Sequence, residues 1–246
     1  MKTELPHISS IRDENGKREY NRLMFGVIAA EYDFITRALS FGRDSSWKKE
    51  LIAALPVSEI EHAVDLACGT GDIALQLTAK YPGAKITGLD LSPQMIALAR
   101  KRNGGSRVEF REGDMIATGL PDACANIVTG GYALRNAPNL AASLREIFRI
   151  LKPGGTAAFL DFSKSAAPAA QKISIGAMRC WGGFWGLLLH RNPAMYTYIA
   201  DSLALFPDRE TLREKIAAAG FVNQRGNRHF AGLIEITICD KPGAGS

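Results

Sequence analysis

The sequence predicts a doubly wound α/β fold built on a mostly parallel sheet, and three observations lead to this fold class. Apolar segments of strand length alternate with segments of helical periodicity between residues 63 and 162. A glycine-rich turn follows the first apolar segment. The chain has 246 residues, of which 46% are hydrophobic and 22% are charged, as in an ordinary globular domain.

Residues 1–56 are predicted to form an N-terminal helical cover over the domain that residues 57–246 build. Between Asn21 and Glu31 apolar residues recur at the spacing of one helix face. A second helix is expected to begin near Ser45 or Ser46, which are good N-cap residues, and to end before Pro56.

The next segments alternate between strand and helix. The predicted strands are Ala63–Ala67, Lys85–Leu89, Arg107–Arg111, Asn126–Gly130 and Thr156–Phe162. The predicted helices follow the glycine turn as far as Lys80, run from Ser92-Pro93 to about Asn103, and span Asn139–Leu151. Because strand–helix–strand units make crossover connections, these five strands are expected to be parallel.

After Ser163 this alternation stops. Residues 164–206 are predicted to be a lid inserted into the domain, with an apolar centre whose glycines would leave it mobile. Asp208 is expected to cap a helix that reaches Ala219, with Gly220 just beyond its end. The two closing strands are Phe221–Arg225 and Leu233–Ile238.

Composition excludes several kinds of protein. No stretch of 18 uncharged apolar residues is present, and the N-terminus lacks the apolar region of a secretory signal. The cysteines (Cys68, Cys124, Cys180 and Cys239) form no C-x-x-C pair, which indicates a reduced, cytoplasmic setting and no metal site. The net charge is +5, and ten Lys and Arg against six Asp and Glu in residues 164–246 are too sparse for a nucleic-acid-binding face.

The glycine-rich turn predicts a cofactor that contains a nucleoside. Gly69-Thr70-Gly71 and the residues after it match G-x-G-x-x-A between a strand and a helix. Asp90 lies nineteen residues beyond Gly71, near the spacing of an acid that binds ribose. This pattern alone fits nicotinamide adenine dinucleotide (NAD) as well as S-adenosyl-L-methionine (SAM).

Charge distinguishes the two cofactors. A dinucleotide would place its pyrophosphate at the helix N-terminus, which attracts anions. Asp72 occupies the first turn of that helix and Asp65 lies near the end of the strand, so two carboxylates would repel a pyrophosphate. SAM carries a sulfonium and an ammonium group but only one carboxylate. The sequence therefore predicts SAM rather than NAD.

Further residues are assigned to the SAM site because they follow strands. Asp90 is expected to accept hydrogen bonds from both ribose hydroxyls, with Leu91 beside it. Asp114 follows the third strand, where a carboxylate can accept a hydrogen bond from the adenine amino group, and Met115 can pack on the adenine ring. The alternative for Asp114 is a loop cap.

Four stretches carry a resemblance to a known family. They are YDFITRALSFGRDSSWK (Tyr32–Lys48), VDLACGTGD (Val64–Asp72), GYALRN (Gly131–Asn136) with RILKPGGTAAFLDFSK (Arg149–Lys164), and YTYIADSLALFPDRETLREKIAAAGF (Tyr196–Phe221). The chain resembles the class I SAM-dependent methyltransferases, and more closely the C-methyltransferases of ubiquinone, menaquinone and phylloquinone biosynthesis. The resemblance implies a Rossmann-like sheet of seven strands with an antiparallel last strand.

The resemblance also implies methyl transfer from SAM to a ring carbon of a lipophilic, polyprenylated quinol. Asp161, in the sequence LDF, is nearer to the naphthoquinone branch, which favours a demethylmenaquinol or demethylphylloquinol over a demethoxy-ubiquinol. The first stretch departs from the family pattern at Ile35, Thr36 and Asp44, and Asp44 replaces a His. The alternative is a related enzyme that methylates another phenolic acceptor.

A quinol carbon becomes nucleophilic when the neighbouring hydroxyl ionises, so the site needs a phenolate stabiliser and a proton acceptor. Arg135 follows the fourth strand, at the sheet edge where ligands bind, and is the candidate stabiliser; a structural ion pair is its alternative. Asn136 is expected to bind the second quinol oxygen. Tyr32 is expected to contact the acceptor, with core packing as its alternative. Four residues remain candidates for the general base: Asp33, Asp44, Asp161 and His190.

The apolar centre of the lid is predicted to hold the prenyl tail, and Trp181 and Trp185 are its candidate residues. The alternative is a helix packed on the core. A lid that touches the bilayer would ease extraction of such a tail, so peripheral contact with the inner face of the membrane is expected. A homodimer is left open.

Overall fold

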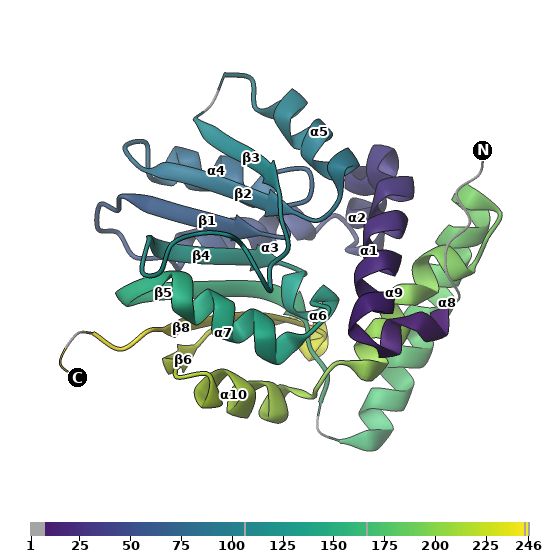
Figure 1. Cartoon of the computed structure of the whole chain (residues 1–246). Helices are drawn as coiled ribbons and strands as arrows, with labels where there is room; N and C mark the ends of the chain where they lie inside the picture. Colours follow the sequence, from purple (N-terminus) through teal and green to yellow (C-terminus); the bar gives the residue numbers. More distant parts are fainter. Residues whose placement is uncertain (1–7, 106, 166, 244, 246) are drawn as a thin grey trace.

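In the described part of the chain, which covers residues 8–105, 107–165, 167–243 and 245, eight strands form one sheet. Figure 1 shows this computed structural model. The strand order is β3-β2-β1-β4-β5-β8-β6, and β7 pairs with β8. The strands are β1 (His62–Leu66), β2 (Lys85–Asp90), β3 (Val108–Glu112), β4 (Ala125–Gly131), β5 (Leu151–Phe162), β6 (Val222–Arg225), β7 (Arg228–His229) and β8 (Ile234–Asp240).

Strands β1 to β5 pair in parallel, whereas β8 is antiparallel to β5, β6 and β7. This topology confirms the predicted doubly wound α/β class with a mostly parallel sheet and an antiparallel last strand. The sheet has one strand more than the seven predicted, because Arg228 and His229 pair with Glu235 and Ile234. A two-residue strand is too short to leave a periodic signal in the sequence.

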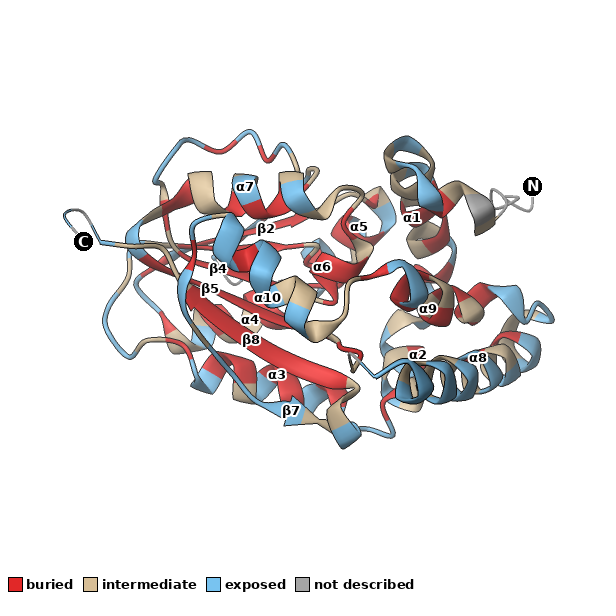
Figure 2. Ribbon diagram, turned by 90° about the horizontal axis from the view of Figure 1, so that it is seen from below, coloured by how far each residue is buried: buried red, intermediate tan, exposed pale blue. Residues whose placement is uncertain are grey.

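Helices cover both faces of the sheet (Figures 1 and 2). They are α1 (Glu14–Ile28), α2 (Tyr32–Leu39), α3 (Asp44–Ala53), α4 (Asp72–Lys80), α5 (Pro93–Arg102), α6 (Ala133–Asn136), α7 (Leu140–Ile150), α8 (Pro168–His190), α9 (Ala194–Leu205) and α10 (Arg209–Ala218). One buried cluster joins α3, α4 and α5 to the sheet, and a second joins α6, α7 and α10. Ala63 belongs to the first cluster and Val64 to the second, as expected for a strand buried on both faces.

Local capping explains where several helices begin. The side chains of Ser92 and Asp208 accept hydrogen bonds from backbone N–H groups at the starts of α5 and α10, as predicted, and Asn139 caps α7 in the same way. Helix α3 begins at Asp44, close to the predicted start, but the expected capping role of Ser45 and Ser46 was wrong, because both serines lie inside the helix. Helix α1 begins well before Asn21, since Asp13 caps it by accepting a hydrogen bond from the Gly16 N–H.

A third group of helices lies at the carboxyl edge of the parallel strands. Helices α1, α2 and α9 share a buried cluster that includes Met24, Ile35 and Tyr198. Helix α8 lies against α9, and Figure 1 shows α1, α8 and α9 together beyond the ends of the strands. The N-terminal segment and residues 168–205 therefore meet over the loops that follow β1 to β4, although they are far apart in the sequence.

Two glycines of α8, Gly182 and Gly186, lie where the helix packs closely against another part of the chain. A Cβ at Gly182 would lie 2.6 Å from the Tyr196 carbonyl oxygen, and one at Gly186 would lie 2.6 Å from the Asn192 carbonyl oxygen. These two glycines let α8 approach the chain around α9. The opposite face of α8 is exposed (Figure 2). Across the described residues, none of the helices combines the length and apolar character needed to cross a bilayer.

Candidate active site

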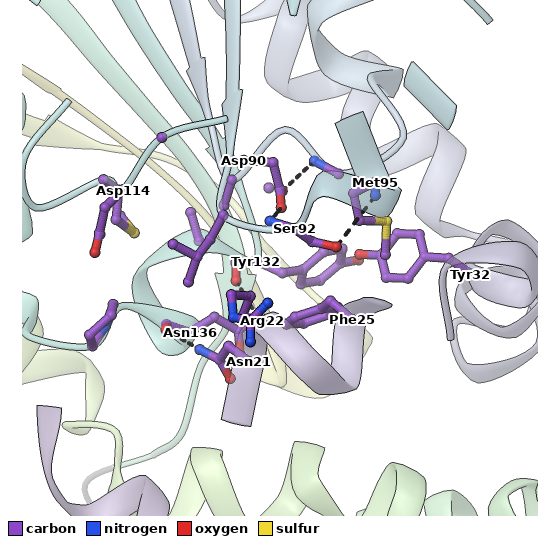
Figure 3. A pocket seen from close by; sticks show the side chains of 18 residues that line it. Asn21, Arg22, Phe25, Tyr32, Asp90, Ser92, Met95, Asp114, Tyr132 and Asn136 are labelled. Atoms are coloured by element: carbon purple, nitrogen blue, oxygen red, sulfur yellow. Dashed lines mark hydrogen bonds between the residues drawn. The ribbon is translucent and has the colours of Figure 1, made fainter. Parts of the chain in front are cut away.

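A cavity lies over the loops that follow β1, β2, β3 and β4 (Figure 3). Its walls include the predicted cofactor residues Gly69, Asp90, Leu91, Asp114 and Met115, together with Tyr32 and Asn136. Figure 3 shows Asp90 and Asp114 on the side of the strands, and Asn21 and Asn136 across from them. We refer to this space as the cofactor cavity. The structure therefore brings together most of the residues that the sequence assigned to SAM.

The turn after β1 has a shape that only glycine adopts without strain. Gly69 and Gly71 have φ angles of +54° and +90°, which lie in the left-handed region. A Cβ at Gly71 would lie 2.7 Å from the Phe110 ring. Gly69 also donates its N–H to Asp90 Oδ2 at 2.8 Å, so the turn is tied to the end of β2.

Asp90 is held rigidly at the wall of the cofactor cavity. Its Oδ1 accepts a hydrogen bond from the Ser92 N–H at 2.9 Å, while its Oδ2 accepts the one from Gly69. Burial raises the pKa of the Asp90 carboxyl. Each oxygen keeps further lone pairs, so an ionised Asp90 can still accept hydrogen bonds from the two hydroxyls of a ribose.

Asp114 also lines the cavity, but it is engaged on both oxygens. Its Oδ1 accepts from the Ile116 N–H at 3.1 Å, which is the loop cap that the sequence left as an alternative. Its Oδ2 accepts from Arg18 Nε at 2.7 Å, and this pairing raises the pKa of Arg18. Met115 is buried beside it. Helix α1 thus reaches the adenine end of the predicted site through Arg18.

A smaller recess behind the turn is lined by three further residues that were assigned to the cofactor: Asp65, Thr70 and Asp72. Gly69 lines this recess as well. Asp65 Oδ2 accepts from the Ala74 N–H at 3.1 Å and its Oδ1 accepts from Thr129 Oγ1 at 2.8 Å. Burial raises the pKa of Asp65 to about 7. A carboxyl group of the protein therefore already occupies the N-terminus of α4, where a pyrophosphate would need to bind.

Asp72 does not act as the sequence argument assumed. Its carboxylate pairs with Lys48 Nζ at 3.0 Å and with Arg102 Nη2 at 2.6 Å, so two cations offset its charge. The Thr70 hydroxyl likewise accepts a hydrogen bond from Arg102 and donates one to Asp33. The exclusion of a pyrophosphate rests on Asp65 at the helix terminus and not on Asp72.

A second cavity adjoins the first and shares four residues with it: Phe25, Tyr32, Tyr132 and Asn136. Its remaining wall is contributed by α1, α2 and α9, together with Arg135 and Phe162. We refer to it as the acceptor cavity. Of the predicted catalytic residues, Tyr32 and Asn136 line both cavities and Arg135 lines only the acceptor cavity.

Arg135 is buried with a carboxylate partner. Its backbone N–H donates to Asp161 Oδ2 at 2.9 Å, and its Nε lies 3.7 Å from Asp161 Oδ1. Its Nη1 donates to Ser202, and its guanidinium carbon lies 5.1 Å from the centre of the Phe162 ring. Nε is buried without a hydrogen-bond partner. The ion pair that the sequence left as an alternative is present, and Arg135 also lines the cavity with donor capacity to spare.

The four candidate bases are placed differently. Asp33 pairs with Arg102 on the surface, and the His190 ring is hydrogen-bonded to the Tyr196 hydroxyl. Asp161 is engaged by Arg135 and the Phe162 N–H. Asp44 is buried and binds Lys48 and Tyr132. Within the described ranges no group of three or more His, Cys, Asp and Glu residues could hold a metal ion.

A third, apolar cavity continues from the acceptor cavity and shares Leu39, Tyr132, Phe162 and Ile199 with it. Its walls include Phe41, Trp47, Met178, Trp181 and Phe230. We refer to it as the apolar cavity. Trp181 stacks on Phe41 with the ring centres 5.1 Å apart. Trp185 packs edge-on against Phe34 and against Trp181 itself, beside the cluster of α1 and α9. Of the two predicted tail residues, Trp181 therefore lines the apolar cavity and Trp185 lies behind it.

Sequence reasoning missed the contribution of α1 and Tyr132. Phe25 lines both the cofactor and acceptor cavities, and Asn21 donates to the Asn136 carbonyl oxygen at 2.7 Å. Phe25 packs partly buried against the cluster of α1, α2 and α9, and helical periodicity alone does not tell such a residue from a core residue. Tyr132 has a φ of +57°, and nothing in the sequence indicates that the chain turns sharply there.

Comparison with known proteins gives a consistent result. The chain matches the ubiE/COQ5 methyltransferase family over residues 14–241. It is 34% identical over 221 residues to a demethylmenaquinone methyltransferase of Thermus thermophilus, which covers 89% of this chain and 100% of that one. It is 34% identical over 225 residues to a 2-phytyl-1,4-naphtoquinone methyltransferase of Thermosynechococcus vestitus, with 89% and 97% covered.

Solved structures agree on the fold. A SAM-dependent methyltransferase of Thermotoga maritima has a TM-score of 0.64 at 18% identity and covers 89% of this chain and 98% of its own. Together with the cavity at the glycine turn, these findings define a class I SAM-dependent methyltransferase. The match over nearly the whole sequence then places it more closely: the chain belongs to the ubiE/COQ5 methyltransferase family.

Proposed function

We propose that this enzyme transfers the methyl group of SAM to a ring carbon of a polyprenylated demethylnaphthoquinol, of the demethylmenaquinol or demethylphylloquinol type. The observation that carries the proposal is the order of the three joined cavities. A cavity with carboxylates leads to one with a buried arginine, and that one leads to an apolar cavity. A sulfonium cofactor, a quinol ring and a prenyl tail present the same order of chemistry. The names of the relatives support a naphthoquinol.

SAM is held by groups that suit its charge. Asp90 accepts hydrogen bonds from the ribose hydroxyls, and Asp114 and Met115 contact the adenine. An ionised Asp90 also favours a cation in the cavity, because opposite charges attract more strongly away from bulk water, whereas Arg18 offsets the charge of Asp114. When bound, SAM supplies the activated methyl group. The protein has to bring the attacking carbon to about 3–3.5 Å from that group.

Arg135 stabilises the phenolate form of the acceptor. A phenol with a pKa of about 10 costs roughly 4 kcal/mol to ionise at pH 7. A guanidinium stays charged at any relevant pH and donates in a planar fork. Asn136 binds the second quinol oxygen. Burial raises the pKa of Tyr32 to about 12, so Tyr32 stays protonated and acts as a hydrogen-bond donor where the two cavities meet.

The prenyl tail lies in the apolar cavity, where Trp181 forms part of the wall. Phe184, Leu187 and Leu188 of α8 are more than half exposed, although they are large and apolar. Arg179 on the same helix is already paired with Asp201. We propose that this apolar face of α8 rests on a membrane surface, from which the tail enters the apolar cavity.

The test is an anaerobic assay with purified protein, SAM and chemically reduced quinols. One quinol is a demethylmenaquinol with a short prenyl tail and the other is a demethoxy-ubiquinol analogue. The product is expected to gain one methyl group on a ring carbon, with faster turnover of the naphthoquinol. A methyl ether as the product, or no turnover of either quinol by protein that binds SAM, would contradict the proposal.

A further inference from the structure

Tyr132 occupies a central position in the active site. It lines the cofactor, acceptor and apolar cavities, and also the small recess behind the glycine turn. It is held there by a left-handed backbone conformation immediately after β4, and its N–H donates to the Leu160 carbonyl oxygen at 2.6 Å. A ring fixed at this junction is placed to contact an acceptor bound next to the methyl group.

The hydroxyl hydrogen of Tyr132 is committed to Asp44. Tyr132 Oη donates to Asp44 Oδ1 at 2.7 Å, and both side chains are buried. Asp44 Oδ2 pairs with Lys48 Nζ at 2.7 Å, and the same ammonium reaches Asp72 Oδ2 at 3.0 Å. An ionised carboxylate only accepts hydrogen bonds, so Asp44 cannot donate to Tyr132.

The groups around Tyr132 keep it protonated. Burial alone would lower the pKa of Lys48, but the carboxylates of Asp44 and Asp72 raise it above its ordinary value. Burial and the Asp44 carboxylate raise the pKa of Tyr132 well above its ordinary value, and Tyr32 and Asp161 act in the same direction. Tyr132 therefore stays a neutral phenol whose one hydrogen points at Asp44.

A hydroxyl whose hydrogen is already used offers only lone pairs to other partners. Toward the cavities, Tyr132 Oη can accept a hydrogen bond but cannot donate one. The reduced form of a quinone carries hydroxyl groups that donate. The oxidised form carries carbonyl oxygens, whose lone pairs would face the lone pairs of Tyr132. The two forms have nearly the same shape, so this contact is a means of telling them apart.

We propose that Tyr132, oriented by Asp44, makes the acceptor site selective for the reduced, hydroxyl form of its acceptor over the oxidised, carbonyl form. This inference rests on the proposed function and names a residue that determines its specificity. Tyr132 touches the acceptor, and Asp44 is a positioning residue that acts through it. A site built to bind a hydroxyl group rejects an analogue without that group strongly, because buried polar groups are then left unpaired.

The test compares binding of 1,4-naphthoquinol and 1,4-naphthoquinone by anaerobic calorimetry, with S-adenosylhomocysteine present. Wild-type protein is expected to bind the quinol about 100-fold more tightly than the quinone. Tyr132→Phe removes the hydroxyl and is expected to lower that ratio at least tenfold. Tyr81→Phe is the matched control, because Tyr81 is buried and donates its hydroxyl to the Pro56 carbonyl oxygen, away from the cavities.

Asp44→Asn is the sharper variant. In this variant Lys48 is expected to donate a hydrogen bond to the new amide oxygen. The amide NH₂ group then faces Tyr132 and donates to its hydroxyl oxygen. The hydroxyl hydrogen of Tyr132 is then free to point into the site, and the preference should shift toward the quinone. Lys48 keeps Asp72 as a charged partner in this variant, which favours normal folding. An unchanged circular dichroism spectrum and melting temperature show that each variant is folded.

The results distinguish failure of the proposed function from failure of the role assigned to Tyr132 and Asp44. If wild-type protein binds S-adenosylhomocysteine but neither naphthalene compound, and turns over no quinol, the proposed function is wrong. If it methylates a naphthoquinol but both variants keep the wild-type ratio of the two affinities, the role of Tyr132 and Asp44 is wrong. Loss of selectivity in Tyr132→Phe with an unchanged ratio in Asp44→Asn would also contradict the orienting role of Asp44.

Discussion

The walls of the cofactor cavity come mainly from loops that follow β1 to β4, whereas the acceptor cavity draws heavily on α1, α2 and α9. In the first, backbone hydrogen bonds fix a carboxylate such as Asp90. In the second, aromatic packing surrounds one buried cation, Arg135. Binding of the cofactor and choice of the acceptor are therefore separate properties of this chain, which single substitutions should affect one at a time.

The largest expected effect concerns the acceptor side. Arg135→Lys keeps a cation beside Asp161 but loses the planar fork that binds a phenolate. We expect kcat to fall about 100-fold to 1,000-fold, while the dissociation constant of SAM changes less than about threefold. Steady-state kinetics and calorimetry check the two values. Arg149→Lys is the control, since Arg149 pairs with Glu146 and Asp122 away from the cavities, and its kcat should stay normal.

The cofactor side should respond in the opposite way. Asp90→Asn keeps an oxygen acceptor but loses the charge, and we expect SAM to bind about 10-fold to 100-fold more weakly. The acceptor KM, measured at saturating SAM, should be unchanged. A large rise in that KM would show that the two cavities are not separate.

The same residue predicts a pH dependence. Burial raises the pKa of Asp90, and the ionised form accepts both ribose hydroxyls. As the pH is lowered, Asp90 takes up its proton at a higher pH than an ordinary aspartate, so SAM affinity should fall on the acid side of neutrality. Calorimetry across this range should show a flatter profile for Asp90→Asn. Equal slopes in the two proteins would assign the pH dependence to another group.

The smallest expected effect separates two tryptophans that the sequence treated alike. Trp181→Ala opens the wall of the apolar cavity and should raise KM about tenfold for a long-tailed quinol, with little change for a tail-less one. Trp185 does not line the apolar cavity but packs edge-on against Phe34 and Trp181, so Trp185→Ala should raise that KM less than Trp181→Ala does. Equal responses of both acceptors to Trp181→Ala would contradict a tail in the apolar cavity.

The difference between the cofactor cavity and the acceptor cavity also explains which parts of the structure the sequence could predict. The sheet, the glycine turn, and the caps at Ser92, Asn139 and Asp208 depend on residues close together in the chain, and their patterns are local. The fold class and most of the cofactor cavity followed from them. The N-cap of α3 was not identified, because Ser45 and Ser46 have the right chemistry for a cap but lie within the first turn of the helix.

Local sequence patterns could not predict contacts between segments that are far apart in the chain. Asp72 was predicted to leave the turn negative, but Lys48 and Arg102 arrive from α3 and α5 and offset its charge. Asp44 departs from the family pattern, but its hydrogen bond with Tyr132 joins residues 88 positions apart, which no local pattern predicts. Charge in the sequence shows which groups need partners, and tertiary structure decides which partners they obtain.

A crystal structure with S-adenosylhomocysteine and a prenylated demethylnaphthoquinol analogue would test the order of the three cavities most directly. We expect the ring between Arg135 and Asn136, a ring carbon facing the sulfur of the cofactor product, and the tail beside Trp181 and Phe230. A ring that does not contact Arg135, or a tail that leaves past α1 over the cofactor cavity, would contradict the account.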